Sequence, residues 1–521
     1  MIRKYDKLVR FFVGIGIGVF LLTHASLGKG LGFGWISDQL KNQALAAAAE
    51  GSTVSGGDDK GSRTPDEPVV GYDFGVAFGD LYKGQRFMPH IRDLKTALTK
   101  VYIFWDQIEP SKGQYRWTII DSFVSQLNES DEALIAIWAS SKWASSCSRK
   151  NYIRGSKPTD MKAYYAFIYN LVKRCQGKVR YFQNDCEPNS QNYWCGTKEE
   201  FVDTLKVFYG AVKDADPDAV VIVGGHDGTF SSGEPDNQGF FDYVFQKGNG
   251  FFDVFDIRLY KDIYDIPHRV GWFKNRMAHY GFSKPIVCTE YGGPIPTQFK
   301  ESQPFRKRFH ALLAEGHSRK EAADKVLEWI EGMRKKGQLV PQIDMFLAGT
   351  SKALEDKRNR IHCRDITQRT IMALSCGVQR LWLWDLINGW GESGRRLHPV
   401  FGKLRLMNYL MSKRFPAYHC FQRMAEVLRK PKTIEKLDVD DDRILFFRVD
   451  KTDGTSCFVV WEKRDYYYGE EAPPTPFSFS IGWDRVRVTD VFGHEEIKPC
   501  KNGTLYLNLR DTPLFIQQMG Q

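Results

Sequence analysis

The chain has 521 residues, of which 42% are hydrophobic and 26% are charged, a composition typical of a soluble globular protein. This length predicts more than one domain, or one large barrel plus a smaller module. The formal net charge is +10, and the basic residues are spread along the chain rather than gathered in runs, which argues against a nucleic-acid-binding protein.

The N-terminus carries the pattern of a targeting segment, which we assign to residues 1–25 as a signal peptide or signal anchor. A basic stretch over residues 1–10 precedes an apolar run over residues 11–22, and Thr23-His24-Ala25 offers a small-x-small cleavage site. The apolar run is shorter than the roughly 20 residues that span a bilayer. We therefore expect the rest of the chain to be exported, as a secreted, periplasmic or membrane-anchored protein. Residues 26–68 are predicted to be a flexible linker because most of the stretch is rich in Ala, Gly, Ser, Asp and Lys.

Strand-like and helical segments alternate over residues 69–428. Helical spacing is found, for example, at 161–175 and 201–212. Eight strands separated by helices predict a closed (β/α)8 barrel. An open doubly wound sheet is the alternative, but the glycines of the segment 75–79 do not match a nucleotide-binding loop. The eight apolar runs are Val70–Phe78, Val101–Trp105, Leu134–Trp138, Val179–Gln183, Val220–Gly224, Val254–Leu259, Ile286–Thr289 and Leu381–Trp384.

Two further features follow in chain order. Residues 318–321 (SRKE) form a capping-box pattern that predicts a helix running to about Arg334. It lies in the long loop after the seventh strand, where it would form either a lid over the barrel mouth or a solvated decoration. After residue 428 the chain changes to short strands separated by Gly, Pro, Asp and Asn, so residues 429–521 are predicted to form an antiparallel β-sandwich.

The ten cysteines suggest a few disulfides rather than a dense framework. Cys147 and Cys195 follow the third and fourth strands and are a plausible pair on one face of the barrel. Cys457 and Cys500, both in the last domain, are a second candidate pair. No set of His, Cys and Asp residues has convincing metal-ligand spacing, so we expect no metal or other cofactor.

Two strand-like segments end in a glutamate. Tyr181–Asn189 reads YFQNDCEPN and contains Glu187, whereas Lys284–Gly293 reads KPIVCTEYGG and contains Glu290. Because functional side chains of a barrel lie at the carboxyl ends of its strands, strands four and seven would bring both glutamates to one mouth. Such a pair is what a retaining glycosidase needs, since one carboxyl group protonates the leaving oxygen and the other attacks the sugar.

With these glutamates on strands four and seven, the chain resembles the glycoside hydrolases of clan A. In that clan the acid/base glutamate ends strand four, typically as Asn-Glu-Pro, and the nucleophile ends strand seven. The segment 104–117 (FWDQIEPSKGQYRW) looks like the stretch after strand two, Asp256–Tyr260 resembles the end of strand six, and Leu381–Trp384 resembles strand eight. Residues 486–517 are similar to the small β domain that follows the barrel in family 39 and its neighbours. The resemblance covers residues 70 to 521.

The resemblance implies a role for each matching residue. Glu187 would be the general acid and then the general base, and Glu290 the nucleophile. Tyr260 would donate a hydrogen bond to Glu290, and Trp384 would stack on the sugar at the point of cleavage. The other residues expected at the substrate are Trp138, Trp143, Asn184, Asn189, His226 and Arg258.

Two positions depart from the pattern of the clan. Cys186 precedes the acid/base glutamate where the clan has an Asn that binds the sugar 2-hydroxyl, and a thiol is a poor hydrogen-bonding group. Either Asn184 or Asn189 takes over that contact, or the preferred sugar differs at C2, or activity is lost. Arg258 stands where many relatives have His, which would suit an acidic or phosphorylated substrate or would pair with a carboxylate of the mouth.

The sequence thus predicts an exported retaining glycoside hydrolase that acts on an oligo- or polysaccharide. One alternative is a non-catalytic carbohydrate-binding protein on the same barrel. Another is a transglycosylase that uses the same two glutamates.

Overall fold

The structure is a computed structural model that describes residues 70–81, 84–147, 155–228, 230–231, 234–235, 239–387 and 402–519. The predicted targeting segment and linker lie outside these residues. Within the described ranges, no helix is long and apolar enough to cross a membrane.

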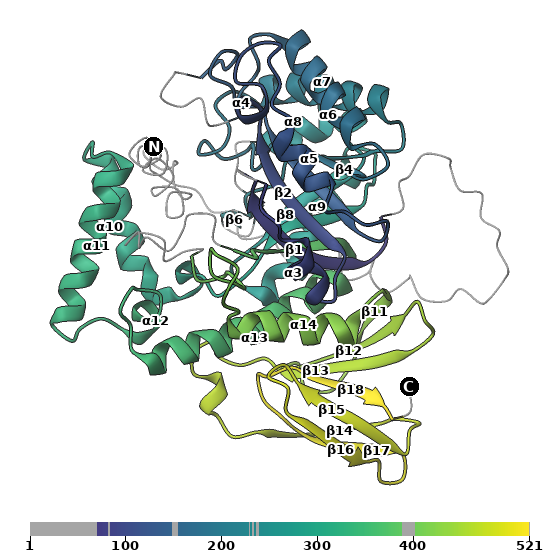
Figure 1. Cartoon of the computed structure of the whole chain (residues 1–521). Helices are drawn as coiled ribbons and strands as arrows, with labels where there is room; N and C mark the ends of the chain where they lie inside the picture. The colour runs from purple at the N-terminus through teal and green to yellow at the C-terminus, as the bar shows by residue number, and fades with distance from the viewer. Residues whose placement is uncertain are drawn as a thin grey trace, which may run out of the picture. The chain divides into compact units, whose positions relative to one another are not determined.

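Eight parallel strands form the barrel, as predicted (Figure 1). Their order in the sheet is β5-β4-β3-β2-β1-β10-β9-β8, and parallel bridges between Ile222 and Val254 and between His226 and Ile257 close the barrel from β5 to β8. A two-stranded ribbon of β6 (Phe230–Ser231) and β7 (Glu234–Pro235) follows β5. The barrel strands are β1 (Asp73–Asp80), β2 (Leu98–Phe104), β3 (Glu132–Trp138), β4 (Tyr181–Asn184), β5 (Val220–Val223), β8 (Phe255–Leu259), β9 (Ile286–Tyr291) and β10 (Val378–Trp384).

The inside of the barrel changes from apolar to polar along the strands. Near the amino ends it is filled by buried side chains such as Leu98, Leu134 and Val287. Nearer the carboxyl ends the buried side chains are polar, and they include Lys100 and Asp256. Burying polar groups costs free energy unless they are paired, so a fold alone does not call for such a layer. Its presence at the carboxyl ends of the strands indicates a functional site there.

Helices surround the strands, and the outer core lies between the two layers. The predicted helix 161–175 matches α6 (Met161–Cys175), and the predicted segment 201–212 lies within α7 (Lys198–Ala215). The other helices around the barrel are α3 (Met88–Asp93), α4 (Trp105–Ile108), α5 (Thr118–Val124), α8 (Phe240–Lys247), α9 (Ile266–His279), α13 (Lys352–Ser375) and α14 (Pro416–Leu428).

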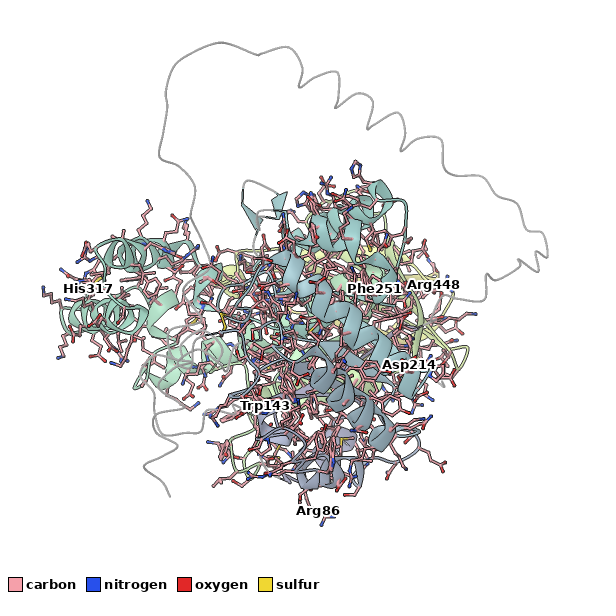
Figure 2. All side chains as sticks on the ribbon, turned by 90° about the horizontal axis from the view of Figure 1, so that it is seen from above. Arg86, Trp143, Asp214, Phe251, His317 and Arg448 are labelled. Carbon is pink, nitrogen blue, oxygen red and sulfur yellow. A yellow bond between two sulfur atoms is a disulfide. The ribbon has the colours of Figure 1, made fainter. Side chains whose placement is uncertain are left out.

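The loop after β9 carries an extra helical hairpin. It consists of α10 (Gln303–Ala314) and α11 (Arg319–Lys335), followed by the short α12 (Pro341–Asp344). The predicted capping box is confirmed, because the hydroxyl of Ser318 accepts from the backbone N–H of Glu321 and its own N–H donates to the Glu321 carboxylate. Figure 2 shows His317 at the far tip of this hairpin, well away from the barrel strands.

The C-terminal domain contains a six-stranded sheet, with the order β11-β12-β13-β18-β15-β16, and a two-stranded sheet of β14 and β17. The packed sheets confirm the predicted antiparallel β-sandwich. The strands are β11 (Pro431–Leu437), β12 (Ile444–Lys451), β13 (Ser456–Glu462), β14 (Thr475–Ser480), β15 (Arg485–Asp490), β16 (Glu495–Pro499), β17 (Thr504–Leu509) and β18 (Leu514–Gln518).

One of the two predicted disulfides is present. Cys147 and Cys195 are bonded to each other. The prediction that Cys457 pairs with Cys500 is wrong, because both are free. Cys457 belongs to the core that continues into the barrel layer, whereas Cys500 packs on the separate core between the two sheets of the sandwich.

Candidate active site

Glu187 and Glu290 lie at the carboxyl end of the barrel. Glu187 follows β4, and Glu290 is the fifth residue of β9. Their side chains are only 12% and 9% exposed. Both glutamates touch the same arginine, so the structure brings together the two residues that the sequence singled out.

An irregularity in β9 positions the Glu290 side chain. In the pairing of β8 with β9, Asp256 stands opposite Val287, but Arg258 stands opposite Glu290, so β9 has one extra residue between the two pairs. Side chains of a regular strand alternate between faces, and a bulge re-aims them. Lys100 consequently contacts the side chains of both Thr289 and Glu290, although these two residues are neighbours in the chain.

Arg258 lies between the two glutamates and is almost completely buried. Its Nε donates to Glu187 Oε1 at 3.2 Å, and its Nη2 lies 3.7 Å from Glu290 Oε1. Its Nη1 donates to Asp256 and to the Thr289 hydroxyl. The departure at this position therefore serves to pair the carboxylates of the mouth, the second of the two roles considered for it.

Glu290 is surrounded by hydrogen-bond donors. Tyr102 donates its hydroxyl proton to Oε1, and Tyr260 donates to Oε2 at 3.0 Å. Lys100 Nζ lies 3.4 Å from Oε1 and also donates to the Tyr102 hydroxyl at 2.7 Å. Burial and Arg258 lower the pKa of Lys100, and the charge of Glu290 opposes that shift. All of these donors favour the ionised form of Glu290.

The surroundings push the pKa values of the two glutamates apart. Burial raises the pKa of Glu187 to about 8, which outweighs the opposing effect of Arg258, and Glu290 adds to the rise. Burial also acts on Glu290, but there Arg258, Lys100 and the tyrosine hydroxyls outweigh it and hold the pKa below its usual value. The two shifts favour a protonated Glu187 beside an ionised Glu290. Opposite shifts of this kind distinguish an acid from a nucleophile.

Aromatic side chains line the region around the glutamates. The Trp384 ring meets Tyr102 edge to face, with the ring centroids 5.9 Å apart, and Trp138 meets the same tyrosine at 6.1 Å. Tyr193, which the sequence analysis missed, packs on Trp138 at 5.5 Å. Trp384 also packs against the buried cluster of Tyr260, Ile295 and Leu404, so two of the three predicted tryptophans, Trp138 and Trp384, lie in the shell of side chains around Glu290.

Three other predicted residues lie elsewhere. Asn184 faces the helical layer, where its Nδ2 reaches the hydroxyl of Tyr164 on α6 at 3.5 Å, so it does not replace the missing Asn at the mouth. The indole N–H of Trp143 donates to the backbone carbonyl of Glu109 at 2.9 Å, and its ring packs on the core. His226 is buried among phenylalanines between the barrel and its helices, and burial lowers its pKa to about 4.

Asn189 and Cys186 remain near the site. Asn189 Oδ1 accepts from the backbone N–H of Asp227 at 3.1 Å, which joins the loops after β4 and β5. The Cys186 thiol lies 3.2 Å from the Tyr102 hydroxyl and 3.6 Å from Arg258 Nη2. Its position beside the tyrosine that binds Glu290 shows that the thiol is part of the polar cluster around the two carboxylates.

Lys100, Tyr102 and Asp256 also belong to this cluster, although none of them was predicted as a site residue. A lysine is rarely buried unless it is paired, so a Lys in the middle of the apolar run Leu98–Phe104 was an available signal. The alternation of a strand then places Tyr102 on the same face as Lys100. No local pattern marks Asp256, whose role depends on its contact with Arg258.

The fold resembles several solved structures of glycoside hydrolases. A family 39 glycoside hydrolase from the gut symbiont Bacteroides cellulosilyticus WH2 has a TM-score of 0.59 and 16% identity, covering 86% of this chain and 81% of that chain. A monomeric beta-xylosidase from Caulobacter crescentus CB15 has a TM-score of 0.54 and 14% identity, covering 86% and 96%. The catalytic domain of the family 30 xylanase C from Talaromyces cellulolyticus has a TM-score of 0.52 and 10% identity, covering 87% and 98%.

No protein-family model matches the sequence, and no curated protein is similar to it in sequence. At the identities above, the structural likeness establishes the fold. The resemblance to clan A, and to family 39 in particular, is therefore confirmed as a likeness of architecture: a (β/α)8 barrel followed by a β-sandwich.

Proposed function

We propose that the protein is a retaining glycoside hydrolase that cleaves O-glycosidic bonds in an oligo- or polysaccharide. The observation that carries the proposal is the pair of buried glutamates at the ends of β4 and β9, whose pKa values are shifted in opposite directions around one guanidinium group. The proteins with a similar fold support the same class of reaction, since they include a beta-xylosidase and a xylanase.

In the first step, Glu187 would protonate the leaving oxygen while Glu290 attacks the sugar. Arg258 holds Glu187 Oε1, and no hydrogen bond to a described residue involves Oε2, so Oε2 is the oxygen from which the proton would pass. The donors from Tyr102, Tyr260 and Lys100 keep Glu290 ionised in the free enzyme.

In the second step, Glu187 would activate a water molecule. Once Glu290 is esterified, it carries no charge, so the repulsion that it adds to the effect of burial on the pKa of Glu187 disappears. Among the described residues, the charged carboxylates that remain paired with Arg258 are then Glu187 and Asp256, which lowers the pKa of Glu187 and suits it to act as a base. A protein that only binds carbohydrate has no use for two carboxyl groups held in opposite protonation states.

We also propose that the protein acts outside the cytoplasm. The basic and apolar N-terminal pattern supports this, and so does the Cys147–Cys195 disulfide, since such bonds persist in oxidising compartments. N-terminal sequencing of the protein recovered from cell fractions tests the proposal. Recovery with residues 1–25 intact in the cytoplasm would contradict it.

The proposed hydrolase activity is tested by measuring the release of reducing sugar from a panel of polysaccharides and aryl glycosides. The full chain is compared with Glu290→Gln, and Glu315→Gln is the control, because Glu315 is an exposed residue of the helical hairpin that pairs with Arg308. Activity in the parent and the control, with collapse in Glu290→Gln, is the expected result. Activity that survives in Glu290→Gln removes Glu290 as the nucleophile. If none of the three proteins releases sugar but glycan binding is retained, the carbohydrate-binding alternative is favoured. Transfer of the sugar to another glycan instead of water identifies a transglycosylase.

A further inference from the structure

A buried ion pair on α13 is linked to the C-terminal domain. Asp365 and Arg369 are both 0% exposed. Arg369 donates to Asp365 with Nε at 2.9 Å and with Nη2 at 2.5 Å. Tyr466, in the loop after β13 of the sandwich, donates its hydroxyl proton to the same carboxylate. A charged pair inside a protein is stable only when its remaining hydrogen-bonding capacity is used, and Tyr466 supplies one of these bonds.

The ion pair reaches the strand that carries Arg258 and Tyr260. Arg369 Nη1 donates to the backbone carbonyl of Leu259 at 3.2 Å. Leu259 lies between the arginine that touches both glutamates and the tyrosine that donates to Glu290. The position of Arg369 therefore affects the backbone that carries Arg258 and Tyr260, the two residues of this strand that contact the glutamates.

The same ion pair also contacts the turn that follows Glu290. A Cβ atom on Gly293 would lie 2.6 Å from Asp365 Oδ2 and 2.8 Å from Arg369 Nη2, so the turn is packed directly on the pair. Gln298 joins this loop to the one after β8, since it accepts from the Ile295 N–H at 2.6 Å and donates to the Lys261 carbonyl at 2.9 Å.

The C-terminal domain also holds the adjoining face of α13 in place. Gln368 Nε2 donates to the Asp511 carbonyl at 2.7 Å, and Arg364 pairs with Glu470 at 2.7 Å. The phenol ring of Tyr466 packs on Phe299, with centroids 5.8 Å apart. The domain thus fixes both the helix that bears the ion pair and the tyrosine that completes it.

We propose that Tyr466 is a positioning residue for the active site. Through Asp365 and Arg369, this side chain of the C-terminal domain sets the backbone at Leu259 and Gly293, and with it the geometry of Tyr260 and Glu290. The β-sandwich is then a working part of the glycosidase and not only a domain packed beside it. The catalytic half of this inference rests on the proposed function, whereas the coupling between the domain and the two loops does not.

The test is Tyr466→Phe in the full chain, which removes one hydroxyl group and keeps the ring. The matched control is Tyr468→Phe in the same loop, because Tyr468 is 52% exposed and its hydroxyl accepts from Gln342 at 3.0 Å. Hydrogen exchange measured by mass spectrometry reports the coupling without any substrate. We expect faster exchange in residues 258–262 and 291–296 of Tyr466→Phe, and no change there in the control.

The kinetic readout is kcat and KM as a function of pH. We expect kcat of Tyr466→Phe to fall roughly tenfold or more, since small misplacements of reacting groups are costly. We also expect KM to change little and the acidic limb of the pH profile to move upward, because a looser Tyr260 hydrogen bond stabilises ionised Glu290 less. A purely structural role would lower the melting temperature without moving that limb.

The outcomes separate the two proposals. Unchanged exchange in both loops overturns the positioning role, whatever the activity. Faster exchange together with a pH profile identical to that of an active parent overturns the link from the loops to Glu290. Faster exchange in a chain that hydrolyses no glycoside upholds the coupling and contradicts the proposed function.

Discussion

Lys100→Met is predicted to raise the pKa of the proposed nucleophile. The substitution keeps an unbranched side chain that is one heavy atom shorter and removes the charge. In the parent, Nζ lies 3.4 Å from Glu290 Oε1 and also donates to the hydroxyl of Tyr102, the partner of the same oxygen. Because a nearby positive charge favours the ionised carboxylate, its loss favours the protonated form of Glu290, which does not attack a sugar.

The geometry gives the size of the effect. Two unit charges at that distance interact by about 5 kcal/mol at an effective dielectric constant of about 20, which is an upper bound of roughly 3.5 pKa units. Arg258, Tyr102 and Tyr260 remain in place and retain most of the stabilisation of ionised Glu290. We therefore expect a rise of about 1 to 2 units.

The assay is the pH dependence of kcat/KM, whose acidic limb reports the base or nucleophile of the free enzyme. In Lys100→Met that limb should move to higher pH by the same amount, with activity largely recovered above it. Lys112→Met is the control, because Lys112 is a 68% exposed lysine that pairs with Asp160 on the surface. An acidic limb that stays where it is in Lys100→Met would refute the assignment of Lys100 and of the charge balance around Glu290.

Three further predictions concern single features. Because the pKa of Glu187 is raised to about 8 and the acid must be protonated, activity should decline as the pH rises through about 8, and Glu187→Gln should lose this basic limb in an assay with an activated aryl glycoside. Gly293→Ala should abolish most activity, since the new Cβ would lie 2.6 Å from a carboxylate oxygen, whereas Gly210→Ala, in an open position of α7, should leave activity intact and stabilise the helix by up to about 1 kcal/mol. Replacing both Cys147 and Cys195 by Ser should lower the free energy of unfolding by roughly 2 to 4 kcal/mol for a loop of 48 residues, as measured by denaturant titration.

The barrel could be predicted because its signal is periodic and local. Each strand is an apolar run bounded by helical segments, so all eight were found near their observed bounds. Periodicity also identified α6 to the residue, where Asp160 caps the first turn by accepting from the Ala163 N–H. The strands β11 and β16 of the last domain show little apolar pattern, because most of their residues are exposed or only partly buried.

The long helix α13 shows that the pattern of charged residues alone does not predict whether a helix is buried. It is buried on nearly every side although it is rich in Arg, Lys, Asp and Glu. Some of its charges pair within the helix, such as Arg369 with Asp365, and others pair with residues far away in the chain, such as Arg364 with Glu470. No rule based on local hydrophobicity predicts such a core helix, because the pairing depends on a domain that follows it by a hundred residues.

The residues of the functional site were predicted only in part, because some of their positions also depend on contacts that the local sequence does not reveal. Glu187 follows β4 and Glu290 lies near the end of β9, and the position of a residue in a barrel strand fixes which end it faces. The direction in which a side chain points within the barrel is harder to predict from the sequence. Asn184 was expected at the mouth, but the alternation of β4 points it to α6, and Glu290 reaches the mouth through a bulge that no sequence pattern announces.

Covalent trapping tests the central claim most directly. The full chain would be incubated with a 2-deoxy-2-fluoro glycosyl fluoride of the sugar that the activity panel identifies, and digested peptides would be examined by mass spectrometry. The predicted result is the mass of one glycosyl group on the peptide that contains Glu290, and its absence in Glu290→Gln. Glycoside hydrolysis with inverted anomeric configuration and no adduct, or an adduct on another residue, would contradict the two-glutamate retaining mechanism.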